Sequence, residues 1–115
     1  MALEQWKLQQ NLPDNHMDAP PFSGYVQAKA LASGVAELVT VPSGATHVVM
    51  RGTADFAALA GGTGAAAAWP TDVSDGSASE LNPDFRRLRS SDTHISVIAA
   101  SSCVVTLAFH QVQNP

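Results

Sequence analysis

The sequence predicts an all-β domain, either an antiparallel β-sandwich or a small β-barrel of jelly-roll-like arrangement, with an extended N-terminal arm. Residues 25–115 contain at least five short runs with strand-like alternation, separated by turns rich in Gly, Pro and Ser. Long helical patterns and fixed-period repeats are both absent. The 115 residues amount to one domain's worth of chain. We therefore expect one β domain over residues 25–115, preceded by an arm over residues 1–24.

The arm is polar and is interrupted by three prolines. Residues 3–10 are predicted to form two helical turns with Leu3 and Trp6 on one side, and residues 14–24 are predicted to be extended because of their prolines. An arm this short has no core of its own, so it packs on its own domain, reaches a neighbouring subunit or stays mobile. A large aromatic side chain favours the contact with a neighbour, because buried aromatics contribute much of the energy of an interface.

The first three strands of the β domain are expected at residues 25–31, 35–41 and 45–53. Gly34 and the Pro42-Ser43-Gly44 run separate them, and this spacing predicts a meander.

The middle of the chain, residues 54–89, contains more loops. Residues 54–60 fit a short helix or a strand equally well. The small side chains of residues 65–68 ahead of Trp69 predict close backbone packing around one large anchor. Asn82-Pro83 predicts a chain reversal or the start of a short helical turn at residues 83–88.

The C-terminal part alternates most clearly, over residues 93–100 and 103–111, which predicts a β-hairpin with Ser101-Ser102 between its strands. No Asp, Glu, Lys or Arg occurs from Thr93 to Pro115. An uncharged exposed sheet promotes aggregation unless it is covered. The hairpin is therefore expected at the centre of a sandwich or in a subunit interface.

The charge balance excludes several classes of partner. Charged residues make up 14% of the chain and the net charge is −4, which argues against nucleic acid or an anionic membrane as a partner. No apolar run approaches the roughly 20 residues that span a bilayer. The N-terminus has neither a basic patch nor an apolar stretch, so we expect no signal peptide. The single cysteine excludes an internal disulfide and is typical of a cytosolic protein.

The residue types that support catalysis or metal binding are present but poorly arranged. His16, His47, His94 and His110 have no metal-ligand spacing, although His94 and His110 would face each other across the predicted hairpin. Cys103 lies on an apolar strand face, where a cysteine acts as a small hydrophobe. We expect no catalytic residue, no metal site and no cofactor, and therefore not an enzyme.

The basic cluster Arg86, Arg87 and Arg89 suits docking on an acidic partner surface or on phosphate. Its alternative is a solvated turn whose arginines pair with Asp84 and Asp92.

The aromatic residues suggest a further alternative. Trp69, Trp6 and Tyr25 would serve as a sugar-binding platform if they met on one surface. Aromatics that are scattered along a chain more often anchor a core or an interface. A carbohydrate-binding module is therefore an alternative to a structural protein.

The runs Val41–Val49 (VPSGATHVV) and Trp69–Ser77 (WPTDVSDGS), the turn Glu80–Pro83 and the closing hairpin resemble small virion proteins of tailed bacteriophages. The resemblance covers roughly residues 35–110. The sequence resembles above all the accessory capsid proteins, which are called decoration or cement proteins. It also resembles head-tail connector and tail structural proteins.

The resemblance implies a non-enzymatic protein on the outer capsid surface, made in the host cytoplasm. Such a protein would bridge subunits of the major capsid protein as a homo-oligomer, and we expect a dimer or a trimer. The arm and the basic turn are the expected partner-binding segments. The candidate residues are Leu3, Trp6, Leu12, Arg86 and Arg87.

Overall fold

The computed structural model describes residues 5–7 and 21–113, with side chains from residue 21 to residue 112. Nine strands and no helix occur in this part of the chain. They are β1 (Gln5–Lys7), β2 (Val26–Leu31), β3 (Glu37–Thr40), β4 (His47–Gly52), β5 (Phe56–Gly61), β6 (Glu80–Leu81), β7 (Phe85–Arg87), β8 (His94–Ala99) and β9 (Cys103–Gln113).

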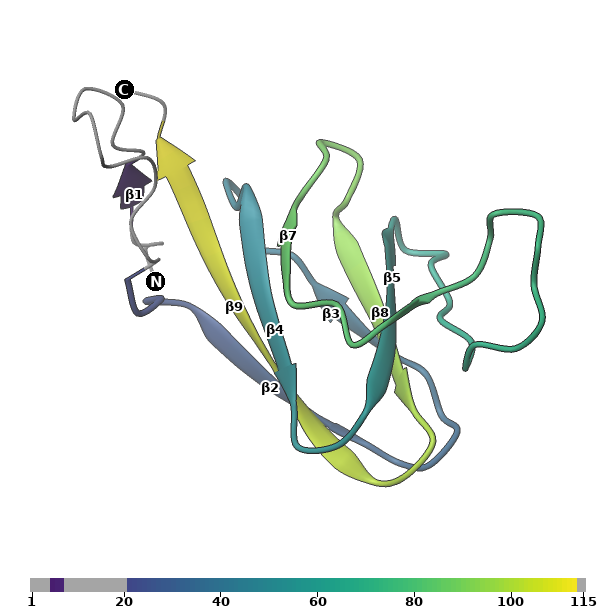
Figure 1. Ribbon diagram of the computed structural model, residues 1–115. Coiled ribbons are helices and arrows are strands. Elements are labelled where there is room, and N and C mark those ends of the chain that lie inside the picture. The colour runs from purple at the N-terminus through teal and green to yellow at the C-terminus, as the bar shows by residue number, and fades with distance from the viewer. Residues whose placement is uncertain (1–4, 8–20, 114–115) are drawn as a thin grey trace, which may run out of the picture.

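Strands β2 to β9 form two antiparallel sheets that pack face to face (Figure 1). One sheet has the order β2-β9-β4-β7 and the other the order β3-β8-β5-β6. Along the chain, strands switch from one sheet to the other at every step except from β5 to β6. These two orders are those of an eight-stranded jelly roll. The predicted β-sandwich of jelly-roll type is confirmed, and the alternative of a closed barrel is wrong.

The predicted meander and the predicted C-terminal hairpin are wrong, although their strands are in place. β8 lies between β3 and β5 in one sheet, whereas β9 lies between β2 and β4 in the other. Ser101-Ser102 therefore carries the chain from one sheet to the other. His94 and His110 consequently do not face each other, and the register places His110 opposite His47. Local alternation defines a strand but does not select its partner.

Three local predictions are also settled. Within the predicted helix at residues 3–10, the described residues Gln5–Lys7 form β1, which pairs in parallel with Gln111–Gln113 at the end of β9. The predicted helical turn at residues 83–88 is instead β7, bound to β4. The ambiguous segment at residues 54–60 is a strand from Phe56 onward, where β5 begins and extends to Gly61. In each case backbone pairing with a distant strand outweighed local helical preference.

The core lies between the sheets and is built from alternate residues of β4, β5, β8 and β9. Its largest fully buried apolar side chains are Phe109, Ile95, Leu107, Val48, Val97 and Val105. The ring of Tyr25 packs edge-on against Phe109, with 6.1 Å between the ring centroids. As strand alternation requires, the next residues along β9, Val104, Thr106 and Ala108, face outward.

The outer face of the β3-β8-β5-β6 sheet is covered by the chain's own β5–β6 connection. The hydroxyl of Ser96 on β8 accepts a hydrogen bond of 2.8 Å from the Ala67 amide. The hydroxyl of Ser79 accepts one of 3.1 Å from the Ala68 amide. Trp69 packs at the edge of a small cluster formed by Ala57, Ala67 and Ile98. Of the alanine run only Ala67 belongs to this cluster, so the predicted close packing around Trp69 is confirmed in part.

Candidate interaction surfaces

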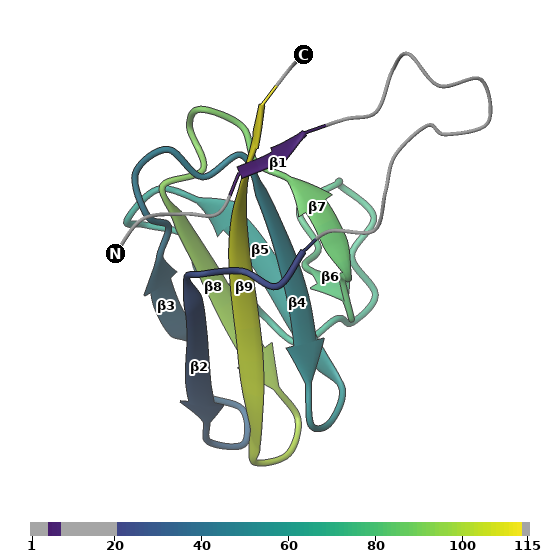
Figure 2. The same cartoon turned by 90° about the vertical axis from the view of Figure 1, so that its left-hand side faces the viewer.

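In the described part of the chain, the outer face of the β2-β9-β4-β7 sheet has no second sheet packed on it (Figure 2). We call it the open face. The side chains at its centre are uncharged and at least partly exposed. The cross-strand register places twelve residues on it, of which His47, Arg51, Arg87 and His110 lie at its borders. The other eight form its centre: Val26, Ala28, Ala30, Val49, Phe85, Val104, Thr106 and Ala108. Val26 is 54% exposed and Val104 is 37% exposed. Of the eight side chains only Thr106 is polar, so the open face is a flat apolar surface of mostly small side chains.

Charged groups occur only along the borders of the open face. On one side Arg51 forms an ion pair of 3.0 Å with Asp84, and both side chains are more than half exposed. At one end, Arg87, His47 and His110 form a row across neighbouring strands. A solvated border around an apolar centre is the arrangement found at many protein–protein interfaces.

The two histidines in that row are held toward the neutral form. Burial is the main cause that lowers the pKa of His47, and the nearby charges of Arg87 and His110 lower it further. Burial also lowers the pKa of His110. The His47 ring packs against Phe85, with 5.5 Å between centroids, and its Nδ1 is 2.9 Å from the Thr46 hydroxyl.

The chain enters the domain on the same side as the open face. The segment leading into β2 crosses in front of β9 and β4, and β1 lies close by on that side (Figures 1 and 2). Ser23 fastens this segment by donating a hydrogen bond of 2.6 Å from its hydroxyl to the Phe109 carbonyl. Phe22 next to it is 99% exposed. An exposed aromatic ring, the β1 strand and the open face therefore share one side of the molecule.

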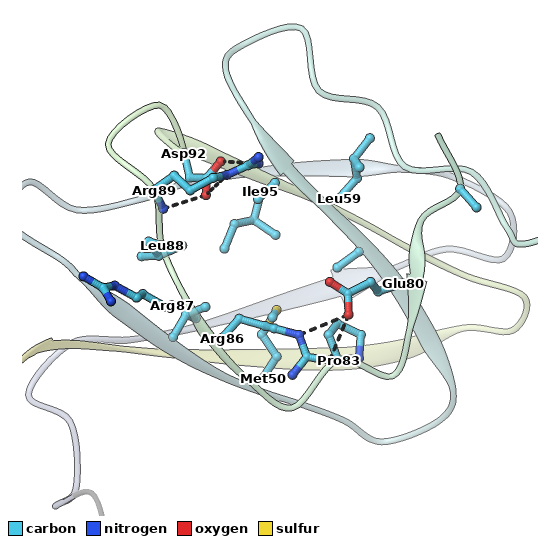
Figure 3. A pocket seen from close by; sticks show the side chains of 14 residues that line it. Met50, Leu59, Glu80, Pro83, Arg86, Arg87, Leu88, Arg89, Asp92 and Ile95 are labelled. Carbon is cyan, nitrogen blue, oxygen red and sulfur yellow. Dashed lines mark hydrogen bonds and ion pairs between the residues drawn. The ribbon is translucent and has the colours of Figure 1, made fainter. Parts of the chain in front are cut away.

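A second feature is a cleft between the sheets on the side where β6 and β7 form the edges (Figure 3). Its volume is about 310 Å³, and its floor includes Val48, Met50, Ala58, Ala60 and Ile95. The opposite side of the sandwich is closed. There the Gln27 side chain donates a hydrogen bond of 2.9 Å to the Thr40 carbonyl, and Lys29 pairs with Glu37 at 3.7 Å.

Two arginine–carboxylate pairs flank the cleft (Figure 3). Arg86 donates hydrogen bonds from Nε and Nη2 to the same oxygen of Glu80, at 3.1 and 2.8 Å. Arg89 instead donates to both oxygens of Asp92, at 3.0 and 2.9 Å, and its backbone amide donates to the same carboxylate at 2.8 Å. The Arg89 hydrogen bonds lower the pKa of Asp92, which is buried.

The candidate partner-binding residues do not form one site. Leu3 and Leu12 lie outside the described residues. Trp6 stands opposite Val112 in the β1–β9 pairing. Arg86 and Arg87 are adjacent on β7, so they point to opposite sides of the sheet.

Arg86 turns into the cleft, whereas Arg87 borders the open face and points away from the cleft (Figure 3). The predicted basic turn is thus a strand whose two arginines serve different surfaces. The alternative of a turn whose arginines pair with Asp84 and Asp92 is confirmed for Arg89 and Asp92 alone. Asp84 pairs with Arg51, which lies outside the cluster. Sequence reasoning missed Glu80, because it lies in the two-residue edge strand β6, which is too short to give a strand pattern.

The described residues contain no group of three or more His, Cys, Asp or Glu side chains placed to hold a metal ion. Across the same residues, no helix has the length and apolarity needed to cross a membrane. No family model, no curated protein and no solved structure matches the chain. The open face and the cleft are therefore the features from which function has to be argued.

Proposed function

We propose that the protein is a non-enzymatic structural component of a tailed-phage virion, a decoration protein that attaches to the major capsid protein and bridges its subunits. The partner surface is the open face together with the N-terminal arm. In this role the protein is a homo-oligomer on the outer capsid surface, and it strengthens the shell because it binds only the assembled form.

The open face is the observation that carries this proposal. An apolar, uncharged sheet face on a small protein is a hazard in solution unless another surface covers it. The opposite outer face of the sandwich is covered by the chain's own loop, so the two faces differ in kind. A protein that works inside an assembly has the partner that such a face requires.

The described part of the N-terminal arm lies on the same side of the molecule as the open face (Figure 2), which supports attachment through that side. Residues 5–7 pair with the end of β9, and Phe22 is fully exposed on the segment that crosses the open-face side. Exposed aromatic rings are frequent anchors of protein interfaces. The jelly-roll fold adds support by analogy alone, since it occurs in viral capsid and lectin domains with many different functions.

Two alternative functions are supported to different degrees by the structure. A head-tail connector or tail protein uses the same kind of surface, and only its copy number per particle separates it from a decoration protein. A carbohydrate-binding module needed Tyr25 and Trp69 on one platform. Tyr25 packs against the main core and Trp69 packs in the separate cluster outside the other sheet, so the positions of these rings do not favour sugar binding.

The test is sedimentation of a native lysate of the source on a density gradient, with each fraction probed for this chain. We expect the chain to travel with large particles at hundreds of copies per particle. A dozen copies or fewer would indicate a connector or tail protein instead. Recovery of the chain only among small soluble species would contradict the virion role.

A further inference from the structure

We propose that the cleft between β6 and β7 binds a small amphipathic monocarboxylate, with the apolar part on the floor of the cleft and the carboxylate on Arg86. This binding site is separate from the open face and does not depend on the virion role. Two observations carry it: the apolar floor of the cleft and the way Arg86 is paired.

The floor of the cleft is apolar and adaptable. Ile95 and Val48 belong to the core and are almost fully buried, and Met50 supplies a flexible thioether beside them. The volume of about 310 Å³ lies at the lower end of ligand pockets in proteins. It equals roughly ten water volumes of about 30 Å³ each, which suits a ligand of about ten non-hydrogen atoms.

The charged side chains that face the cleft form two balanced pairs, Arg86 with Glu80 and Arg89 with Asp92. The lining also includes Arg87, but its side chain points away from the cleft (Figure 3). The preference for an anion therefore depends on how the two facing arginines are paired.

Arg86 is the arginine that is able to exchange its partner. Its Nε and Nη2 both donate to a single oxygen of Glu80, and the two side chains are 46% and 60% exposed. Exposed ion pairs of this kind contribute about 0–1 kcal/mol. A ligand carboxylate that offers both oxygens to the guanidinium forms the stronger two-oxygen fork.

Arg89 does not have this freedom. It already forms the fork with both oxygens of Asp92, which is buried and also accepts a hydrogen bond from the Arg89 amide. This pair closes the turn at the end of the cleft and stays in place. The two superficially similar pairs therefore have different roles, one fixed and one exchangeable.

The test is a titration of the full chain with octanoate, octanol and octylammonium, followed by amide chemical shifts in ¹⁵N-labelled protein. We expect octanoate to shift the amides of Arg86, Leu88 and Ile95 with a Kd on the order of 1 mM, as small ligands of this size allow. Octanol is expected to bind at least fivefold more weakly and octylammonium more weakly still.

Two single substitutions should move octanoate affinity in opposite directions. Arg86→Gln removes the carboxylate's partner and should weaken binding at least tenfold. Glu80→Gln removes its competitor and should strengthen binding about threefold or more. Arg51→Gln is the control, since Arg51 is also an exposed, ion-paired arginine but lies outside the cleft, and it should leave the affinity unchanged.

Equal binding of octanol and octanoate would overturn the assignment of the carboxylate to Arg86. So would weaker octanoate binding in the Glu80→Gln variant, or shifts confined to the open face. No shift with octanoate up to about 20 mM, well above the affinity expected for a ligand of this size, would overturn the site as a whole. Amide-shift dispersion in each variant shows that the fold is retained, so none of these outcomes is ambiguous.

Discussion

The carboxylate of Glu80 and the guanidinium of Arg86 meet at 2.8 Å across the gap between the two sheets, each from an edge strand. Both register partners, Ala58 for Glu80 and Val48 for Arg86, face the core, so both charged side chains point inward at an edge. Inward-pointing charges on short edge strands discourage pairing with another chain. The pair thus protects two edges of the sandwich while leaving a cleft behind it.

The Glu80–Arg86 pair and the buried Asp92 should differ in their contribution to stability. Glu80→Gln should change the free energy of unfolding by less than about 1 kcal/mol, because exposed ion pairs contribute little. Asp92→Ala should cost about 1–3 kcal/mol, because it removes three hydrogen bonds that Arg89 donates to a buried carboxylate. Urea denaturation of both variants measures the difference, and equal losses would contradict this division.

Gly52 at the end of β4 has no room for a side chain. A Cβ there would lie 2.6 Å from the Ala54 carbonyl oxygen and 2.7 Å from the buried ring of Phe56. Gly52→Ala should therefore cost about 1–3 kcal/mol through forced displacement of the backbone or the ring. Gly62→Ala is the matched control, since nothing lies within 4 Å of its Cβ. A thermal melt in which both variants unfold like the parent protein would disprove the steric argument.

The lowered pKa values of His47 and His110 predict a stability that falls in mild acid. Below about pH 6.5 the unfolded chain takes up protons that the folded protein resists, so the free energy of unfolding decreases as the pH falls. The slope is at most about 1.4 kcal/mol per pH unit for each histidine. Asp92 acts in the same direction at lower pH, since its lowered pKa stabilises the fold above about pH 4 and that contribution is lost in stronger acid.

Urea denaturation at several pH values from 7.5 to about 4.5 tests the histidine prediction, because this window spans the usual titration range of His and stays above that of Asp. A variant with both His47→Gln and His110→Gln should show a flatter slope, whatever its absolute stability. An unchanged slope in that variant would assign the pH dependence to other groups.

Deletion of residues 1–22 should leave the sandwich folded and abolish attachment to capsids. The deletion removes β1 and the exposed Phe22 but keeps Ser23, whose hydroxyl binds the Phe109 carbonyl. Circular dichroism and cosedimentation with purified capsids measure the two effects separately. A truncated protein that still binds at full stoichiometry would remove the arm from the proposed interface.

A charge on the open face should also block attachment. Ala28 is exposed at the centre of β2, so Ala28→Glu should change the free energy of unfolding by no more than about 0.5 kcal/mol. In a covered interface the same carboxylate would be buried without a partner, and capsid affinity should fall at least tenfold.

Ala66→Glu is the matched control, because Ala66 is exposed in the loop over the opposite sheet. It should bind capsids as the parent protein does. If both variants bind alike, the open face is not the contact surface.

The local pattern of the chain was enough to predict the β-sandwich and most of its strands. β2, β3, β4 and β8 lie within the predicted runs of alternating or β-branched residues, and β9 begins with its run and extends two residues beyond it. This information is local. The same pattern was not enough for β7, because Asn82-Pro83 fits a helix start as well as a reversal. Only the pairing of Phe85–Arg87 with β4 makes that segment a strand.

Tertiary structure alone decided which strands are neighbours and which side chains meet. Alternation is identical for a strand paired in a hairpin and one that crosses to the other sheet, so the predicted hairpin of residues 93–111 was wrong while both its strands were right. The meeting of Glu80 with Arg86 likewise depends on two edge strands of different sheets coming together. The sequence pattern determines which side chains of a strand face the core, and long-range packing determines which strand becomes its neighbour in the sheet.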